Sequence, residues 1–188
     1  MILVITGNGK GKTTSALGTA IRACGWEKRV AMVFFDKGGS HYGEQNILNL
    51  LQGKIDTYRF GLKRFDEEKK EFRFKNTEAD KVEVKKGIDK VFTLYKEKHA
   101  PSARRGGSKA EGYFLIVCDE LVTCLNSGLI DDSSVQKLVN KCPKDTHLLL
   151  TGRGAPDWLI GKADLVSDVK EVKHYFKKGD GAINGLDY

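Results

Sequence analysis

The residues with the clearest chemical potential lie near the amino terminus, in a glycine-rich loop. They are Gly7, Asn8, Gly9, Lys10, Gly11, Lys12, Thr13 and Thr14. The β-prone run 1–6 precedes them and the helix-forming stretch 15–21 follows, which is the order that a phosphate-binding loop requires. Glycines let successive N–H groups point into one concavity, and the helix start adds unpaired N–H groups and the positive end of its dipole. Lys12 would contact phosphate oxygens and the Thr13 hydroxyl would ligate Mg²⁺, so the loop predicts a polyphosphate site.

The loop is shorter than the standard pattern. Four residues normally separate the first glycine from the Gly-Lys pair, which would place a glycine at Thr6, and counting from Gly7 leaves three. The alternative interpretation is a glycine-rich turn that binds no ligand. The shortened loop suggests that it holds phosphates differently from an ordinary ATPase.

A pair of carboxylates forms the second chemical motif. Asp119 and Glu120 directly follow the apolar run 113–118, as in the acidic Walker B strand. Carboxylates at the carboxyl end of a neighbouring strand can hold Mg²⁺ directly or through its waters, opposite Thr13. Such a pair is weak evidence alone, but together with the glycine loop it is strong evidence for a metal–phosphate site.

Two cations also follow expected strands. Arg153 stands between two glycines after the run 146–151, where its guanidinium is suited to a bidentate phosphate contact. A structural ion pair is the alternative. Lys37 follows the apolar run 30–35, at the strand end where ligands collect in open α/β sheets. It could contact phosphate or substrate, or be a solvated loop lysine.

The elements that must position these residues alternate between strands and helices. We expect helices over about 12–24, 44–51 and 77–98, another with caps from 131–134, and strands over 30–35, about 55–60, 113–118 and 146–151. Gly25 is the expected end of the first helix. Gly87 should weaken the long helix by roughly 1 kcal/mol relative to alanine. This pattern predicts an α/β fold of the RecA-like P-loop NTPase type, with a mostly parallel central sheet and helices on both faces.

The middle of the chain is the least regular part. The segment 61–76 carries Phe65, Phe72 and Phe74 among many charges, so these rings either close over a flat ligand or anchor the loop to the domain. The stretch 101–108 is typical of an exposed loop. We expect one domain over 1–188, with 61–112 as its variable part.

Composition limits the classes of protein to consider. The chain has 188 residues and four cysteines without a Cys-x-x-Cys pair, its first strand begins at Met1, and no apolar run is long enough to span a membrane. These features predict a cytoplasmic protein with reduced thiols. The net charge of +7 comes from 54–109, which has 17 Lys and Arg against 10 Asp and Glu. Solvated helix faces explain this excess, and an attractor for an anionic ligand or nucleic acid is the alternative.

Taken together, the motifs resemble the P-loop ATP:corrinoid adenosyltransferases. The resemblance spans nearly the whole chain, including the shortened glycine loop. The matching runs are 7–14, 43–48, 119–121, 150–156, 163–168, 172–174 and 185–188.

The resemblance implies transfer of the 5′-deoxyadenosyl group of MgATP to the cobalt of a reduced corrinoid such as cob(I)alamin, with release of tripolyphosphate. It implies that residues 7–14 hold the triphosphate, that Thr13 with Asp119 or Glu120 holds Mg²⁺, and that Arg153 meets phosphate charge. Lys12, Glu120 and Arg153 are the expected catalytic residues. A flavoprotein reductase as electron donor and a homodimer are implied as well, with no membrane and no nucleic-acid partner.

One departure concerns the corrinoid side. Relatives carry a Gly-Phe-Thr-Trp element in the middle segment, whose aromatic rings help to displace the lower ligand of cobalt. This chain has no tryptophan there, and Phe72 or Phe74 is the candidate replacement. A RecA-like ATPase acting on nucleic acid, a small-molecule kinase, and a non-catalytic ATP- or corrinoid-binding protein are the alternative functions.

Overall fold

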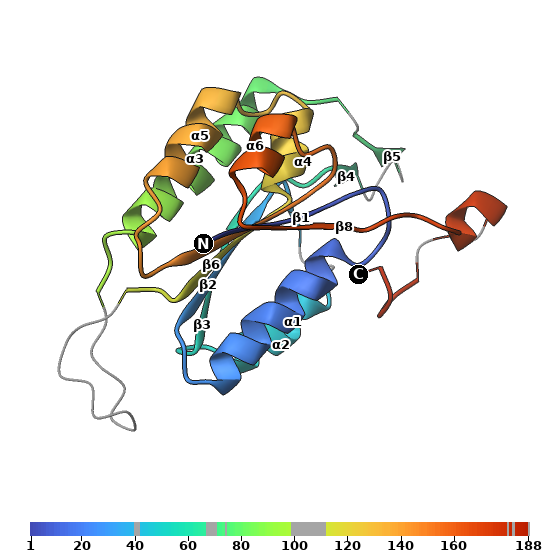
Figure 1. Cartoon of the computed structure of the whole chain (residues 1–188). Helices are drawn as coiled ribbons and strands as arrows, with labels where there is room; N and C mark the ends of the chain where they lie inside the picture. Colours follow the sequence, from blue (N-terminus) through green and yellow to red (C-terminus); the bar gives the residue numbers. More distant parts are fainter. Residues whose placement is uncertain are drawn as a thin grey trace.

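The computed structural model describes residues 1–39, 42–66, 71–73, 75–98, 112–179, 181 and 183–187. Its centre is a six-stranded parallel sheet in the order β3-β2-β6-β7-β1-β8 (Figure 1). The strands are β1 (Ile2–Thr6), β2 (Val30–Phe35), β3 (Ile55–Phe60), β6 (Leu115–Asp119), β7 (His147–Thr151) and β8 (Leu165–Asp168). The expected α/β fold with a parallel sheet is thereby confirmed.

The inner strands are apolar on both faces because helices cover both sides of the sheet. All six residues of β2 are buried, and their side chains alternate between two hydrophobic clusters: Ala31 packs in one and Met32 in the other. This continuous burial is what an apolar run without polar alternation predicts.

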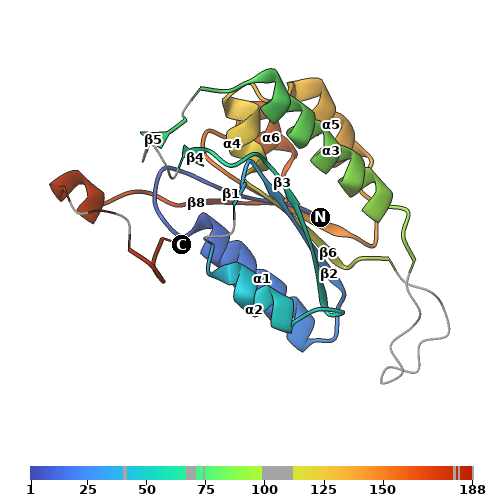
Figure 2. The same cartoon turned by 180° about the vertical axis from the view of Figure 1, so that it is seen from behind.

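Two helices cover one face of the sheet. They are α1 (Lys12–Gly25) and α2 (Glu44–Leu50), which lie side by side in both views (Figures 1 and 2). Small residues of α1, among them Ala16 and Ala20, pack against the sheet with Leu48 of α2. The first helix therefore approaches the sheet closely, and its amino terminus lies directly after the glycine loop.

The other face carries the remaining α-helices of the described chain. These are α3 (Glu78–Leu94), α4 (Leu121–Asn126), α5 (Asp132–Asn140) and α6 (Asp157–Lys162). Thr77 caps α3 in a reciprocal capping box with Asp80, and Asp131 caps α5. Gly87 of α3 faces Phe35 so closely that an added Cβ would lie 2.4 Å from the ring. The glycine is therefore a packing requirement of this helix and not only a local weakness.

Strand register brings the chemically important loops to one edge of the sheet. Ile5 pairs with Thr151, Thr6 with Asp168, and Phe34 with Asp119. The loops that follow β1, β2, β6 and β7 consequently leave from the same carboxyl edge.

The middle segment is more regular than its sequence suggested. It contains an antiparallel pair, β4 (Phe65–Asp66) and β5 (Glu71–Phe72), in which Phe65 pairs with Phe72 along the backbone. Two arginines connect this pair to the domain: Arg64 Nε donates to Asp36 Oδ1 at 2.8 Å, and Arg73 forms a bidentate pair with Asp80 at 2.7 and 2.8 Å. The expectation of an irregular loop over 61–76 was therefore wrong in part.

The other differences from the expected secondary structure concern the boundaries of elements and several short elements. The expected 77–98 helix ends at Leu94, and the strand expected to begin at residue 113 begins at Leu115. Besides β4 and β5, the elements not predicted are α4, α6, the 3-10 helix Tyr175–Lys178 and the exposed edge strand β8. The expected loop 101–108 and Phe74 lie outside the described residues. Over the part of the chain that is described, the structure contains no helix of the length and apolarity needed to cross a membrane.

Candidate nucleotide site

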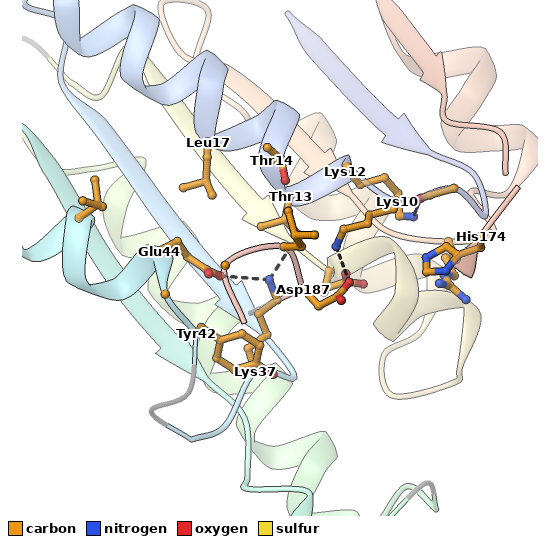
Figure 3. A pocket seen from close by; sticks show the side chains of 18 residues that line it. Lys10, Lys12, Thr13, Thr14, Leu17, Lys37, Tyr42, Glu44, His174 and Asp187 are labelled. Atoms are coloured by element: carbon orange, nitrogen blue, oxygen red, sulfur yellow. Dashed lines mark hydrogen bonds and ion pairs between the residues drawn. The ribbon is translucent and has the colours of Figure 1, made fainter. Parts of the chain in front are cut away.

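An open pocket of about 620 Å³ lies at the carboxyl edge of the sheet (Figure 3). Its walls come from the glycine loop with the first turns of α1, the connection between β2 and α2, the end of β6, the loop after β7, and the chain after β8. The predicted site residues that line it are Gly9, Lys10, Gly11, Lys12, Thr13, Thr14, Lys37, Glu120 and Arg153. Residues from five separate stretches of the sequence therefore meet in one place.

The glycine loop needs its glycines for two different reasons. Gly7 and Gly11 have positive φ angles of 102° and 112°, which side chains other than glycine rarely allow. Cβ atoms on Gly7 or Gly9 would lie within 3 Å of the chain at 168–170. The Gly9 N–H donates to the Val169 carbonyl at 2.7 Å. The loop is thus fixed against the segment that follows β8, and it delivers the chain into α1 at Lys12.

Lys12 is buried at the base of this loop, with 6% of its surface exposed. Its Nζ donates to the Gly9 carbonyl at 2.7 Å. Burial lowers the pKa of Lys12, and the Arg153 guanidinium lowers it further, while Glu120 and Asp119 oppose these effects. An anion in the pocket would restore a counter-charge to Lys12, which is the behaviour expected of a phosphate-binding lysine.

Asp119 lies at the centre of the polar network, completely buried. Its Oδ1 accepts from Thr151 Oγ1 at 2.7 Å, and its Oδ2 accepts from Thr13 Oγ1 at 3.2 Å. The second oxygen also pairs with Lys37 Nζ at 2.7 Å. The predicted metal ligands Thr13 and Asp119 are therefore in direct contact.

Lys37 is not a solvated loop residue. Only 12% of its side chain is exposed, and its Nζ lies 2.7 Å from Asp119, 3.6 Å from Glu44 Oε1 and 3.3 Å from Thr13 Oγ1. Burial alone would lower the pKa of Lys37, but the attraction of Asp119 and Glu44 leaves it raised. Lys37 thus brings a permanent positive charge to the position where a carboxylate and a hydroxyl meet.

Glu120 is held in an unusual backbone conformation. Its φ of 63° places a residue other than glycine in the left-handed region, which costs of order 1 kcal/mol and is concentrated at functional sites. Its N–H donates to Thr151 Oγ1 at 2.9 Å, and its carboxylate accepts from Thr123 Oγ1 at 2.5 Å. Thr123 also accepts from the Arg153 N–H at 2.9 Å. The Thr123 hydroxyl therefore links the carboxylate of Glu120, a predicted metal ligand, to the backbone of Arg153.

The chemistry of the donor set fits Mg²⁺. The Thr13 hydroxyl and the carboxylates of Asp119 and Glu120 are hard oxygen ligands, which suit Mg²⁺ together with phosphate oxygens and water. No group of three or more His, Cys, Asp or Glu side chains forms a metal cage within the residues that the structure describes.

Some pocket residues were not predicted as site residues. Tyr42 and Glu44 come from the β2–α2 connection, and His174 and Asp187 come from the C-terminal tail, defined here as residues 169–187. Lys10 Nζ pairs with Asp187 Oδ1 at 2.6 Å (Figure 3). Glu44 follows the end of β2, so its position could have been found by the same strand-end argument as Lys37. Nothing in the local sequence indicates that the tail returns to the glycine loop.

The remaining predicted residues have different positions. Gly7 and Asn8 belong to the loop without lining the pocket, and Asp119 lies behind the surface formed by Thr13 and Lys37. Phe72 lies in β5, but its side chain and all of Phe74 are outside the described part of the structure. Their role toward a flat ligand stays a prediction.

Comparison with known proteins gives a consistent result over the full chain. A model of the family described as ATP:corrinoid adenosyltransferase BtuR/CobO/CobP matches residues 1–188. The corrinoid adenosyltransferase of Escherichia coli K12 is 31% identical over 188 residues, covering 100% of this chain and 85% of that protein. Corrinoid adenosyltransferase CobA of Salmonella typhimurium LT2 is 32% identical with the same coverage. The corrinoid adenosyltransferase of Pseudomonas aeruginosa PAO1 is 29% identical over 188 residues, with coverages of 100% and 83%.

Proposed function

The chain belongs to the ATP:corrinoid adenosyltransferase family, and we propose that it transfers the 5′-deoxyadenosyl group of ATP to the cobalt of a reduced corrinoid. In this reaction the cobalt electron pair forms the new Co–C bond while the bond between C5′ and the phosphate oxygen breaks. The electron pair of the broken bond leaves with tripolyphosphate. The protein must therefore stabilise a highly charged leaving group and keep C5′ accessible.

One observation carries this proposal: the glycine loop, Lys12 and Arg153 converge on the same open pocket, beside the Thr13–Asp119 contact. Positive charge and oriented N–H groups are concentrated where negative charge would grow on the departing triphosphate. Preorganised charge of this kind is usually the largest contribution to catalysis. No side chain has to act as nucleophile, since the cobalt supplies the attacking electron pair, so positioning and electrostatics are sufficient.

Individual roles follow from the contacts. The loop residues Gly7 to Thr14 would hold the triphosphate, and Lys12 would exchange its contact with the Gly9 carbonyl for a phosphate oxygen. Arg153 would also meet phosphate charge, with its backbone N–H held by the Thr123 hydroxyl. The same Thr123 hydroxyl donates to the carboxylate of Glu120, which also lines the pocket.

Magnesium would be held by Thr13 and Glu120, with Asp119 acting behind them. When bound, Mg²⁺ would neutralise part of the triphosphate charge. Both Asp119 oxygens already have protein partners, and Lys37 is one of them. Lys37 would then either remain as a second cation beside the metal or turn toward phosphate.

The corrinoid side of the site rests on the resemblance and not on contacts. We propose that residues 1–188 act as a single domain and that the 61–112 segment faces the macrocycle, with Phe72 or Phe74 displacing the lower ligand of cobalt. The links from Arg64 to Asp36 and from Arg73 to Asp80 support this, since they fix the β4–β5 pair beside the carboxyl edge of the sheet. A homodimer and an electron-donating flavoprotein reductase are further parts of the proposal.

The products test the proposal directly. The protein is incubated anaerobically with MgATP and chemically reduced cobalamin, and we expect a light-sensitive cobalt–carbon product and tripolyphosphate in equal amounts. A phosphohydrolase or kinase would release ADP instead. Formation of ADP without a change in the corrinoid spectrum would refute adenosyl transfer.

A further inference from the structure

A carboxylate of the C-terminal tail occupies the mouth of the proposed phosphate site. Asp187 Oδ1 lies 2.6 Å from the Nζ of Lys10, a residue in the middle of the glycine loop. In Figure 3 these two side chains point toward one another across the pocket, next to Lys12 and Thr13. An acidic group therefore neutralises one of the loop cations at a site arranged for anions.

Contacts within the C-terminal tail hold the Asp187 side chain in position. Its second oxygen, Oδ2, accepts from the Tyr175 hydroxyl and from the Ile183 N–H, the latter at 2.8 Å. The Asp187 N–H donates to the Ile183 carbonyl at 2.8 Å, which closes a turn around the side chain. The Lys10 ammonium, and after it the Tyr175 hydroxyl and the Ile183 N–H, hold the pKa of Asp187 well below its usual range. The carboxylate is thus charged at neutral pH and oriented by its own segment.

The start of the tail is fixed to the same loop. The Gly9 N–H donates to Val169, and Gly7 and Gly9 lie against the backbone at 168–170. The tail therefore begins against the glycine loop and returns to it at Asp187. These two contacts hold the tail against the glycine loop at both ends, at Val169 and at Asp187.

We propose that Asp187 is an affinity-determining residue that competes with the polyphosphate for Lys10. The inference rests on the proposed function, since it assumes that the loop binds triphosphate. Binding would exchange the Lys10–Asp187 pair for a Lys10–phosphate contact and leave the Asp187 carboxylate facing phosphate charge. The loss of the Lys10–Asp187 pair and the repulsion between Asp187 and phosphate both weaken binding. Asp187 would therefore favour release of tripolyphosphate after transfer.

The partial exposure of the Lys10–Asp187 pair determines how large a change in tripolyphosphate affinity we expect. The side chains of Lys10 and Asp187 are 39% and 17% exposed, so water screens their attraction. Exposed ion pairs contribute little each, and we expect Asp187→Asn to bind tripolyphosphate about two- to fivefold more tightly than the unchanged protein. Tyr175→Phe keeps the charge but removes one orienting hydrogen bond, and a smaller change in the same direction should follow.

The test is titration calorimetry with tripolyphosphate and Mg²⁺ on the full chain. Asp145→Asn is the matched control, because Asp145 is an exposed carboxylate at the opposite end of the sheet, before β7. In the Lys10→Gln background, Asp187→Asn should improve binding by less than it does in the unchanged protein, because only the repulsion between Asp187 and phosphate is then removed. Unchanged or weaker binding by Asp187→Asn, with the fold intact by circular dichroism, would overturn the inference. Failure of the unchanged protein to bind tripolyphosphate or ATP would instead overturn the proposed function.

Discussion

The Lys37 ammonium lies 2.7 Å from the fully buried Asp119 carboxylate, beside the hydroxyl of Thr13. It therefore supplies a positive charge at the position where the nucleotide metal is expected. This arrangement explains how a buried carboxylate is tolerated without a bound ligand, and it leads to the first prediction.

Replacing Lys37 by glutamine should leave Asp119 without its charged partner. Removing one member of a buried ion pair typically costs about 3–5 kcal/mol, and we expect a loss near the lower end of that range without ligand. MgATP should raise the Tm of Lys37→Gln by more than it raises the Tm of the unchanged protein, because the metal restores the missing charge. Thermal unfolding with and without MgATP measures both effects. Lys81→Gln removes a mostly exposed pair with Glu78 and should change stability by less than about 1 kcal/mol.

Lys12→Ala should abolish nucleotide binding. Lys12 is the buried cation at the base of the loop, and its Nζ is held 2.7 Å from the Gly9 carbonyl. Calorimetry with MgATP measures the loss, and the exposed Lys144, at the opposite end of the sheet, provides the control substitution Lys144→Ala. Equal ATP affinity in Lys12→Ala and the unchanged protein would show that the loop does not hold phosphates through this residue.

At least one of Phe72→Ala and Phe74→Ala, tested separately, should selectively slow reduction of Co(II) in the bound corrinoid. The expected cause is the loss of a ring that displaces the lower ligand of cobalt. The rate is followed spectroscopically, with ATP affinity measured in parallel as the internal control, since the nucleotide site should be unaffected. Normal reduction rates in both variants would remove the proposed role of these rings.

Asp80→Asn should flatten the dependence of stability on pH under acid conditions. Hydrogen bonds from Arg73 and then from Thr77 hold the pKa of the buried Asp80 carboxyl well below its usual range. Because the folded pKa is lowered, the stabilisation is complete above the unfolded value of about 3.9 and is lost as pH falls below it. Urea unfolding at pH 7, 5 and 3 should show a loss of about 1–3 kcal/mol at pH 7 that shrinks toward pH 3. Asp89→Asn, on the exposed face of the same helix, is the matched control for removing a helical carboxylate.

Gly87→Ala should destabilise the fold although alanine favours helices. An added Cβ would lie 2.4 Å from the Phe35 ring, and overpacking of a filled core typically costs about 1–3 kcal/mol. Gly18→Ala is the matched control, since Gly18 is also inside a helix but has open space around it. That change should stabilise by up to about 1 kcal/mol. Chemical denaturation of both variants measures the change in the free energy of unfolding. It shows whether packing against Phe35 outweighs helix propensity at position 87.

Much of the fold could be predicted because the apolar runs are long and bounded. The runs ending at Phe35, Cys118 and Thr151 became buried parallel strands, and the register brought their ends together as expected. Membership of the family, inferred from the motifs, is confirmed by the match over 1–188. The edge strand β8 escaped prediction because all four of its residues are exposed, so no pattern of burial marks it.

The site was predictable where the chemistry is local and not where it depends on distant contacts. Lys12 and Thr13 belong to a contiguous motif, and Asp119 follows a recognisable strand. The contacts of Arg153 with Thr123 and of Asp187 with Lys10 join residues 30 and 177 positions apart, through segments that carry no periodic signal. Gly87 shows the same difference: its cost to the helix is visible in the sequence, but its neighbour Phe35 is 52 positions away.

The hydrogen bond from the Gly9 N–H to the Val169 carbonyl removes one backbone donor from those that the glycine loop can offer to a ligand. That N–H points at a carbonyl of the same chain and is closed to an incoming anion while the bond lasts. The oxygen atoms of a bound phosphate must then accept hydrogen bonds from the N–H groups at the start of α1. The backbone directly after β8 thereby favours anchoring of a polyphosphate at the helix end of the loop.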